Sequence, residues 1–396
     1  MLQDFLFYFY FLGEVQLLKK FSSKIILAFA ALLMVALLTA GCGGSKTENK
    51  TAGQSGEPEK LKVGFVYIGP VDDNGWTTAH DQGRKYLEEK LPYVETSYVE
   101  NVPENPADAE RVITQLAEEG NKVIFTTSFG YMDPTINVAK KYPDVIFLHC
   151  SGYKNDKNVA AYFGRMYQAR YLSGIAAGKA TKSNLIGYVA AFPIPEVIRG
   201  INAFTLGVQK VNPDAKVKVV WTHTWIDAAA EKDAAVALLD SGADVIAQHQ
   251  DSPGPQQAAE AVGKFGVGYN SDMGKMAPKA VLTSPVWNWG PFYVQIVQAI
   301  KEGKFDSTPK CGSLTYWPGL KDGIIGLAPY GPMVSEETKQ LIEQEKQRII
   351  SGEWDVFTGP IKDQQGQVKV PDGQKLSDND MLNMDWFVQG VEGSTK

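Results

Sequence analysis

Short apolar runs that alternate with longer helical patterns constrain the fold of this chain more than any other feature. The runs are LKVGFVYI (61–68), KVIFTT (122–127), DVIFLH (144–149), NLIGYVA (184–190), VKVVW (217–221), DVIAQH (244–249), KAVLTS (279–284) and DGIIGLA (322–328). Because these runs are almost continuously apolar, they predict parallel strands buried on both faces. The sequence therefore predicts an α/β fold with helices on both sides of a parallel sheet.

Helical patterns separate the predicted strands. They cover residues 106–120, 168–181, 228–243 and 335–353, and another helical run ends near Leu91. In the helix at 335–353, Ser335 is a predicted N-cap, and Glu336 and Glu337 follow in the first turn, where the helix dipole favours acids.

The alternation continues on both sides of a polar KSN stretch that starts at Lys182. A chain of 396 residues, 44% of them hydrophobic, is long enough for two α/β domains of about 150 residues each. We therefore expect a first lobe at 61–182 and a second at 183–290, with a cleft between them. Residues 291–396 would return to the first lobe and continue as a C-terminal extension.

Residues 1–41 have the pattern of a bacterial signal peptide. Lys19, Lys20 and Lys24 precede an apolar stretch at 25–40, which is shorter than the ~20 residues of a comfortable membrane span. The stretch ends in LLTAGC, which resembles a lipobox and predicts lipidation of Cys42. An uncleaved anchor helix is the alternative. Either interpretation predicts a protein at the extracytoplasmic face of the cell membrane.

Residues 42–60 are rich in Gly, Ser, Thr and Glu and contain no aromatic residue. This composition is typical of a flexible tether. A tether after a lipid-bearing Cys42 would let the folded body work close to the membrane.

Composition and motifs exclude several classes of function. The net charge is −6 and no block of Lys and Arg is present, so we expect no nucleic-acid partner. Nucleophile, phosphate-loop and dinucleotide motifs are missing, and the four His lack metal-ligand spacing. We therefore expect a binding protein rather than an enzyme, with no metal and no cofactor. Cys150 and Cys311 are expected to be thiols, with a disulfide between them as the alternative.

Polar and aromatic residues gather directly after the predicted strands. The stretches are VDDNGWTTAHDQGR (71–84), TTSFGYMDP (126–134), THTWID (222–227), QHQDSPGP (248–255), GYNSDM (268–273) and SPVWNWGP (284–291). In open α/β sheets, ligands bind where the carboxyl ends of the strands meet. Six such stretches therefore predict one ligand site in the cleft.

Three aromatic residues in these stretches are candidate walls for a planar ligand. Stacking of Trp76, Phe129 or Trp225 on a nucleobase would contribute ~1–3 kcal/mol per base with little discrimination. The alternative for Trp76 is a cap over the core of its lobe. His80 lies four residues after Trp76, so a helix would place both on one face.

Discrimination between ligands needs buried hydrogen bonds that a wrong ligand leaves unpaired. Asp73, Asp251 and Asp272 are the candidate acids, because carboxylates accept hydrogen bonds from amines and ring N–H groups. Each of them could instead cap the helix that follows it.

The motifs quoted above resemble the basic membrane protein family. The lipobox, the tether, GFVYIGPVDDNGW, TTSFGYMD, RYLSGIAAG, DVIAQHQDSP and VLTSPVWNWGP carry the resemblance over about residues 61–360. Members of this family are lipid-anchored substrate-binding proteins of ABC importers, similar to purine nucleoside receptors. The resemblance implies a type I periplasmic-binding-protein fold, in which two doubly wound lobes joined by a hinge hold the ligand, and an ABC permease partner.

The resemblance also implies roles for individual residues. Trp76 and Trp225 would be the two aromatic walls, and Asp272 would lie among the sugar-binding acids. Trp287 occupies the position where the family often has a Lys that reaches the sugar. A ring at this position fits a free base better than a nucleoside, and GW-x-x-x-H and QH-x-DSP resemble the branch associated with adenine. We therefore expect adenine or a related free purine, with a nucleoside next.

Two other functions remain open at this stage. An exported nucleoside hydrolase would need a metal or carboxylate cluster on the sugar. A sensor of the same fold would serve a signalling partner instead of a permease.

Overall fold

The computed structural model describes residues 60–396, which form one compact unit. The predicted signal peptide, lipobox, Cys42 and nearly all of the tether lie outside the described residues. Within residues 60–396, no helix is long and apolar enough to cross a membrane.

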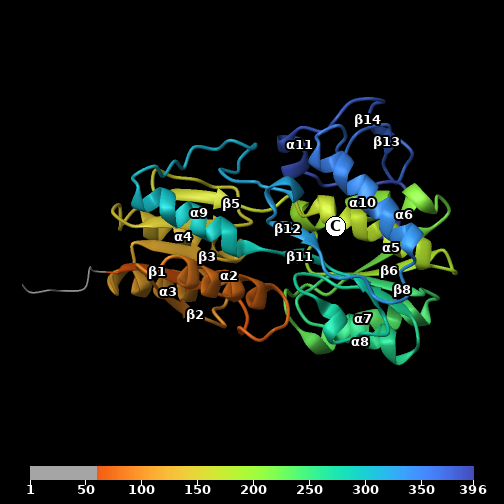
Figure 1. Ribbon diagram of the computed structural model, residues 1–396, viewed down its shortest axis with the longest axis horizontal. Helices are drawn as coiled ribbons and strands as arrows, with labels where there is room; N and C mark the ends of the chain where they lie inside the picture. The colour runs from red at the N-terminus through yellow and green to blue at the C-terminus, as the bar shows by residue number, and fades with distance from the viewer. Residues whose placement is uncertain (1–59) are drawn as a thin grey trace, which may run out of the picture. The chain divides into compact units, whose positions relative to one another are not determined.

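The first lobe is a five-stranded parallel sheet in the order β2-β1-β3-β4-β5 (Figure 1). The strands are β1 (Leu61–Val66), β2 (Val94–Val99), β3 (Val123–Thr126), β4 (Ile146–Cys150) and β5 (Val159–Tyr162). The helical elements of this lobe are α2 (Trp76–Lys90), α3 (Pro106–Glu118), η1 (Phe129–Tyr131) and α4 (Met132–Ala139). β3 and the body of β1 are fully buried, as their unbroken apolar runs predict, whereas the edge strand β2 is half-exposed and was not predicted.

The second lobe is a six-stranded parallel sheet in the order β10-β9-β8-β6-β7-β15. The strands are β6 (Leu185–Ala190), β7 (Lys216–Trp221), β8 (Val245–His249), β9 (Phe265–Val267), β10 (Val281–Thr283) and β15 (Val391–Glu392). The helical elements are α5 (Tyr167–Ala180), α6 (Pro195–Val211), α7 (Ala228–Asp240), α8 (Gly254–Ala261) and η2 (Met273–Lys275). The parallel sheets with helices confirm the predicted α/β class.

The two sheets have the same topology. β6 to β10 follow one another in the second lobe as β1 to β5 do in the first, and each sheet reverses its order beside its first strand. These reversals lie between β1 and β3, and between β6 and β8. A reversal of strand order opens a crevice at the carboxyl ends of the strands, where ligands of doubly wound sheets bind.

The chain after β10 contributes to both lobes. β11 (Pro285–Trp287) precedes α9 (Trp289–Lys301), and β12 (Ile325–Leu327) follows it and pairs with β11 in an antiparallel arrangement. α9 packs on α2 of the first lobe. η3 (Leu320–Asp322) leads into β12, and α10 (Glu336–Ile350) packs on α5. Ser335 caps α10 by accepting a hydrogen bond from the Thr338 backbone N–H, as predicted.

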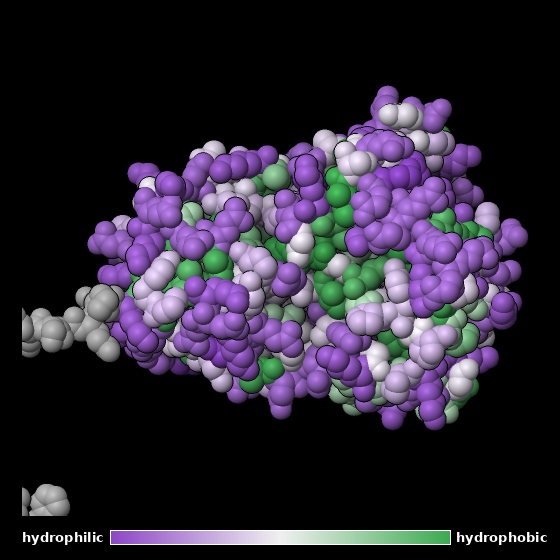
Figure 2. Space-filling view, in the orientation of Figure 1, coloured by the Kyte–Doolittle hydropathy of each residue, from purple (hydrophilic) through white to green (hydrophobic). Residues whose placement is uncertain are grey.

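The last segment comprises β13 (Ile361–Lys362), β14 (Val368–Val370) and α11 (Asp378–Leu382) before β15 joins the edge of the second sheet. Figure 1 shows this segment, in dark blue, beside α6 and α10. Figure 2 shows hydrophobic residues gathered near the middle of the visible face, with mostly hydrophilic residues on either side.

The cysteines of the described part are unpaired, which confirms the expected thiols. Cys150 is buried at the end of β4, and Cys311 is partly buried in the loop after α9.

Candidate functional site

A small cavity, of about 20 Å³, lies at the carboxyl ends of both sheets. Each lobe supplies five of its lining residues. They are Ile68, Trp76, Ser128, Phe129 and Ser151 from the first lobe, and Glu196, Trp225, His249, Asp251 and Tyr269 from the second. Ile68, Ser128 and Asp251 each lie two residues after the end of a strand, β1, β3 and β8 respectively. Glu196 lies in the first turn of α6, which follows β6, so the cavity lies at the two reversals of strand order. The predicted Trp76, Phe129, Trp225 and Asp251 thus meet in one place.

Trp76 is both a wall of the cavity and part of the core. It begins α2, is 8% exposed, and donates its indole N–H to the Thr127 carbonyl at 2.6 Å. Its ring packs edge-to-face with the rings of His80 and Trp289, whose centroids lie 4.3 and 5.9 Å from the centroid of Trp76. Trp76 therefore covers the core of its lobe and also lines the cavity, and its stacking on a ligand stays a prediction.

His80 lies behind Trp76 and does not line the cavity. Its ring stacks on Trp289 at 4.7 Å, its Nδ1 is hydrogen-bonded to the Tyr293 hydroxyl, and it is fully buried. Burial lowers the pKa of His80 well below its ordinary value, so the ring is neutral. As predicted, Trp76 and His80 lie on the same face of α2, but at His80 this face points into the core of the first lobe.

Asp251, which is buried, and Glu196, which is only partly buried, bring two carboxyl groups to the cavity. Asp251 Oδ1 accepts a hydrogen bond from the Asn270 side-chain amide at 2.8 Å. Burial, and then the charge of Asp73, raise the pKa of Asp251 well above its ordinary value. Burial raises the pKa of Glu196 to about 7, against the opposing charge of Arg199.

Glu196 has a carboxyl oxygen to offer to a ligand. Its Oε1 lies 3.5 Å from His249 Nε2, while its Oε2 is buried without a hydrogen-bond partner within the protein. Burial lowers the pKa of His249 well below its ordinary value, so the two groups are not an ion pair. His249 Nδ1 is also buried without a partner. Buried polar atoms without partners are rare, and they mark places where a ligand or water completes the bonding.

Trp287 supports the cavity from a second layer. Its indole N–H donates to Asn270 Oδ1 at 2.9 Å, and Asn270 in turn donates to Asp251. Its ring stacks on Trp289 at 4.5 Å. Trp287 therefore orients Asp251 through Asn270 and is not itself a lining residue.

Asp73 and Asp272 are helix caps. Asp73 accepts hydrogen bonds from the backbone N–H groups of Gly75, Thr77 and Thr78 at 2.7–2.9 Å, at the start of α2. Asp272 accepts from the Gly274 N–H at 3.2 Å and begins η2. Neither residue lines the cavity, so the capping alternative describes both.

Contacts between the lobes close the rim of the cavity. The Trp225 indole N–H donates to Glu104 Oε2 of the first lobe at 2.9 Å. The Ser271 hydroxyl donates to the carbonyl of Asn74. Gly75 lies so close to Asp251 that a Cβ at position 75 would stand 2.0 Å from the Asp251 carbonyl oxygen. The lobes are thus in contact around the cavity.

Sequence reasoning missed Glu196, His249 and Tyr269. His249 ends β8 inside the QHQDSPGP stretch, and Tyr269 is the second residue of GYNSDM, so both were within reach of the strand-end rule. Glu196 follows β6 in AFPIPE, where apolar neighbours and two prolines hide a single acid.

Two doubly wound lobes that close on a strand-end cavity define a ligand-binding receptor of the periplasmic-binding-protein class. The chain belongs to the Bmp family of PnrA-like ABC transporter substrate-binding proteins, which matches residues 60–357. It is therefore a transport substrate-binding protein and not an enzyme, as the resemblance implied.

Three known proteins illustrate the relationship. The chain is 49% identical over 335 residues to "Purine-binding protein BAB2_0673" of Brucella abortus, covering 84% of this chain and 93% of the relative. It is 40% identical over 355 residues to "Putative ABC transporter glucose-binding protein TsgA13" of Haloferax volcanii, covering 90% and 86%. A solute-binding protein structure from Aeropyrum pernix has a TM-score of 0.64 at 21% identity, covering 76% of this chain and 93% of its own, and confirms the predicted fold.

Proposed function

We propose that this protein binds a purine in the cavity between its lobes, with the free base adenine preferred over nucleosides, and delivers it to an ABC permease. The observation that carries the proposal is the pairing of aromatic walls with two carboxyl groups, those of the buried Asp251 and the partly buried Glu196, in one small cavity. A planar heteroaromatic ring with hydrogen-bonding edges fits this combination.

The cavity is small in this arrangement of the lobes. Its volume of about 20 Å³ is far below the ~300–1,000 Å³ of ligand pockets, so a purine enters only when the lobes move apart. Trp76, Phe129 and Trp225 line it, which supplies flat faces for stacking. This supports a free base as the preferred ligand, with a nucleoside second.

The raised pKa values of the acids are compatible with adenine. A neutral carboxyl group both donates and accepts, whereas an ionised one only accepts. Adenine presents an amine donor beside a ring-nitrogen acceptor, which is the complement of a neutral carboxyl. Guanine presents two neighbouring N–H donors, which complement an ionised carboxylate, and its N–H beside a carbonyl also fits a neutral one. Because the pKa of both Asp251 and Glu196 is raised, more of each acid is neutral than its ordinary pKa would give, and the neutral form is the one that accommodates adenine. Hypoxanthine, with an N–H beside a carbonyl, also fits one neutral acid and is the second base.

A sugar is the second candidate ligand, because the Haloferax relative carries a glucose-binding name. The name of the Brucella relative, at higher identity, supports a purine. The lining favours the purine as well, because it offers several rings and few hydroxyl-reading amide groups.

Isothermal titration of residues 43–396, refolded to remove carried-over ligand, tests the proposal. The ligands are adenine, guanine, hypoxanthine, adenosine and glucose. Tight binding of adenine, with adenosine weaker, supports it. Preference for adenosine would restore the nucleoside, and preference for glucose would exclude a purine receptor.

We further propose that Cys42 carries a lipid that holds the protein at the extracytoplasmic face of the membrane. The Cys42→Ala variant should lose incorporation of a labelled fatty acid and appear in the medium or periplasmic fraction. Labelling that persists in this variant would exclude Cys42 as the lipidated residue.

A further inference from the structure

A second small cavity shares three lining residues with the ligand cavity. Its volume is about 10 Å³, close to the ~10–15 Å³ that one buried water molecule needs. Glu196, His249 and Tyr269 line both cavities, whereas Arg170 and Gly200 line the second and not the first. A group bound in the second cavity would therefore reach Glu196 from the side away from the ligand.

Arg170 of α5 brings a fixed positive charge to the second cavity. It is fully buried, its Nη1 donates to the Gln248 carbonyl at 2.6 Å, and its guanidinium lies 3.6 Å from the centre of the Tyr269 ring. Its Nε and Nη2 are buried without a hydrogen-bond partner within the protein. Because a guanidinium stays charged and buried polar groups are paired, these two N–H groups call for an acceptor.

Two groups without partners line the same cavity and can accept. They are Glu196 Oε2 and His249 Nδ1, both of them buried. When Glu196 is ionised, its Oε1 only accepts, so the proton of the neutral His249 ring lies on Nε2, 3.5 Å away, and Nδ1 accepts. One water molecule accepts two hydrogen bonds and donates two, which complements two N–H groups and two acceptors.

Gly200 provides the space between these groups. It lies four residues after Glu196 on α6, so the two share a face of the helix. Apart from the helix backbone, the nearest atoms to a Cβ at position 200 would be Arg170 Nε and His249 Nδ1, each 3.7 Å away. Both atoms therefore face the space beside Gly200, and the methyl group of an alanine would take up that space without a clash.

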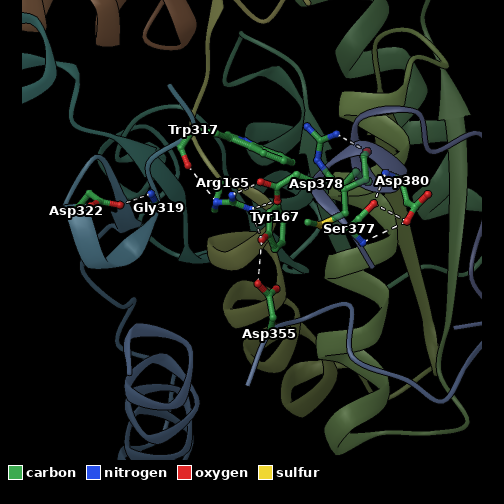
Figure 3. Close-up of polar contacts among 11 residues, drawn as sticks. Arg165, Tyr167, Trp317, Gly319, Asp322, Asp355, Ser377, Asp378 and Asp380 are labelled. Atoms are coloured by element: carbon green, nitrogen blue, oxygen red, sulfur yellow. Dashed lines mark hydrogen bonds and ion pairs between the residues drawn. The ribbon is translucent and has the colours of Figure 1, made fainter. Parts of the chain in front are cut away.

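Arg199, the other guanidinium that lines this cavity, is engaged on its far side. Its Nη1 donates to the Met381 carbonyl of α11 at 2.7 Å, and its guanidinium lies 5.0 Å from the centre of the Trp317 ring. Figure 3 shows Trp317 beside Arg165, whose guanidinium binds Asp378 of the same helix. The donors that face the acid in this cavity therefore come from α5.

We propose that the second cavity is a site for one water molecule, which accepts hydrogen bonds from Arg170 and donates to Glu196 and His249. Arg170 is then a positioning residue, because it acts through the water on the acid that faces the ligand. The water site is defined by the protein alone, and only its consequence for purine affinity rests on the proposed function.

The site should influence how readily Glu196 ionises. Burial raises the pKa of Glu196 to about 7, whereas the charges of Arg199 and Arg170 lower it. A water that donates to the ionised carboxylate adds to the lowering, so its loss should raise the pKa of Glu196 further. The charged and titratable groups near Glu196 are Arg170, Arg199, His249, Asp251, Tyr269, Cys150 and Glu104.

The test is the Gly200→Ala variant of residues 43–396, which fills the space beside Arg170. Alanine is a better helix former than glycine, so we expect the variant to fold. Carbon-13 NMR of labelled glutamate carboxyl groups, with the Glu196 signal assigned from Glu196→Gln, measures ionisation without ligand. We expect the Glu196 midpoint to rise by about one pH unit, and the pH dependence of adenine affinity to move by the same amount.

Gly326→Ala is the matched control, because it adds the same methyl group where no atom lies within 4 Å. It should leave the Glu196 midpoint unchanged. Arg170→Met is the second variant, and it should raise the midpoint at least as far as Gly200→Ala does. An unchanged midpoint in Gly200→Ala, or an equal shift in Gly326→Ala, would overturn the role given to the water.

Crystal structures of the two proteins test the water directly. A high-resolution structure of the wild type should show one solvent peak bonded to Arg170 and Glu196, and that of Gly200→Ala should show none. No peak in the wild type would overturn the site, and anomalous scattering there in crystals grown from bromide would assign an anion instead. If the midpoint shifts as expected but adenine does not bind, the water site stands and the proposed function fails.

Discussion

Gly75 at the start of α2 lies directly against the backbone carbonyl of Asp251 in the other lobe. A Cβ at position 75 would stand 2.0 Å from that oxygen, a distance that real Cβ atoms do not reach. The backbone N–H of Gly75 also donates to Asp73 Oδ1 at 2.7 Å, so the glycine cannot move independently of the helix cap. Closure of the two lobes thus requires glycine, which has no side chain, at position 75.

Gly75→Ala should therefore hinder closure without unfolding either lobe. We expect adenine affinity to fall by about tenfold or more, the size of an overpacked contact, with little change in the thermal midpoint of the unliganded protein. Gly326→Ala is the control, because a Cβ at position 326 meets no atom within 4 Å. Unchanged adenine affinity in Gly75→Ala would mean that the ligand is held without this contact.

Trp225→Phe should speed the release of the ligand. The change keeps a ring in the cavity but removes the N–H that donates to Glu104 across the lobes. A hydrogen bond to a charged group contributes about 1.5–3 kcal/mol, so stopped-flow measurements should show release about tenfold faster or more. Trp221→Phe is the control, because its N–H bonds to the Ser394 carbonyl away from the cavity. Equal release rates in the two variants would mean that the hydrogen bond from Trp225 to Glu104 does not hold the lobes closed on the ligand.

Glu196→Gln should change how stability depends on pH. The pKa of Glu196 is raised to about 7 in the folded protein from an ordinary value of 4.5, so the folded state keeps a proton that the unfolded state releases. Its contribution to the free energy of unfolding therefore decreases as pH rises from about 4.5 to 7. Above this window we expect the variant to be more stable than the wild type by up to about 3 kcal/mol.

Glu231→Gln separates the effect on binding from the effect on stability. Glu231 has its pKa raised to about 7 by burial as well, but it hydrogen-bonds to Ser252 and does not line the cavity. Both variants should flatten the pH dependence of unfolding, measured by urea titration, and only Glu196→Gln should flatten that of adenine binding. If adenine binding lost its pH dependence in both variants, Glu196 would affect binding only through the stability of the fold.

Trp76→Phe and Trp76→Ala should separate the two roles of this residue. The Phe variant keeps a stacking face and loses the hydrogen bond to Thr127, so we expect a loss of affinity below tenfold. The Ala variant also opens the core and should destabilise the fold by about 3–5 kcal/mol. Calorimetry on the folded fraction should show at least about tenfold weaker binding for Ala. Equal affinities in all three proteins would place the ligand elsewhere.

The fold followed from the sequence because its central strands are buried on both faces. β1, β3, β6 and β8 appear as apolar runs for this reason, whereas the half-exposed β2 and the four-residue β5 leave only weak patterns. The position of the cavity followed from the same rule, since strand ends in a parallel sheet point to one edge.

The individual site residues were less predictable. An Asp after a strand either reaches the cleft or caps the next helix, and Asp251 and Asp73 have the same local sequence signal with different outcomes. The choice depends on which backbone N–H groups lie nearby, which only the fold determines. Glu196 gave no signal, because its role comes from burial between the lobes.

The measurement that tests this account most directly is the ratio of adenine to guanine affinity at about pH 6 and about pH 9. These values lie on either side of the pKa of Glu196, which is about 7. We predict tight adenine binding at the lower pH, and an adenine preference that declines by up to about tenfold per pH unit above pH 7 as the carboxyl ionises. A preference for guanine at both values, or binding of neither base, would contradict the account.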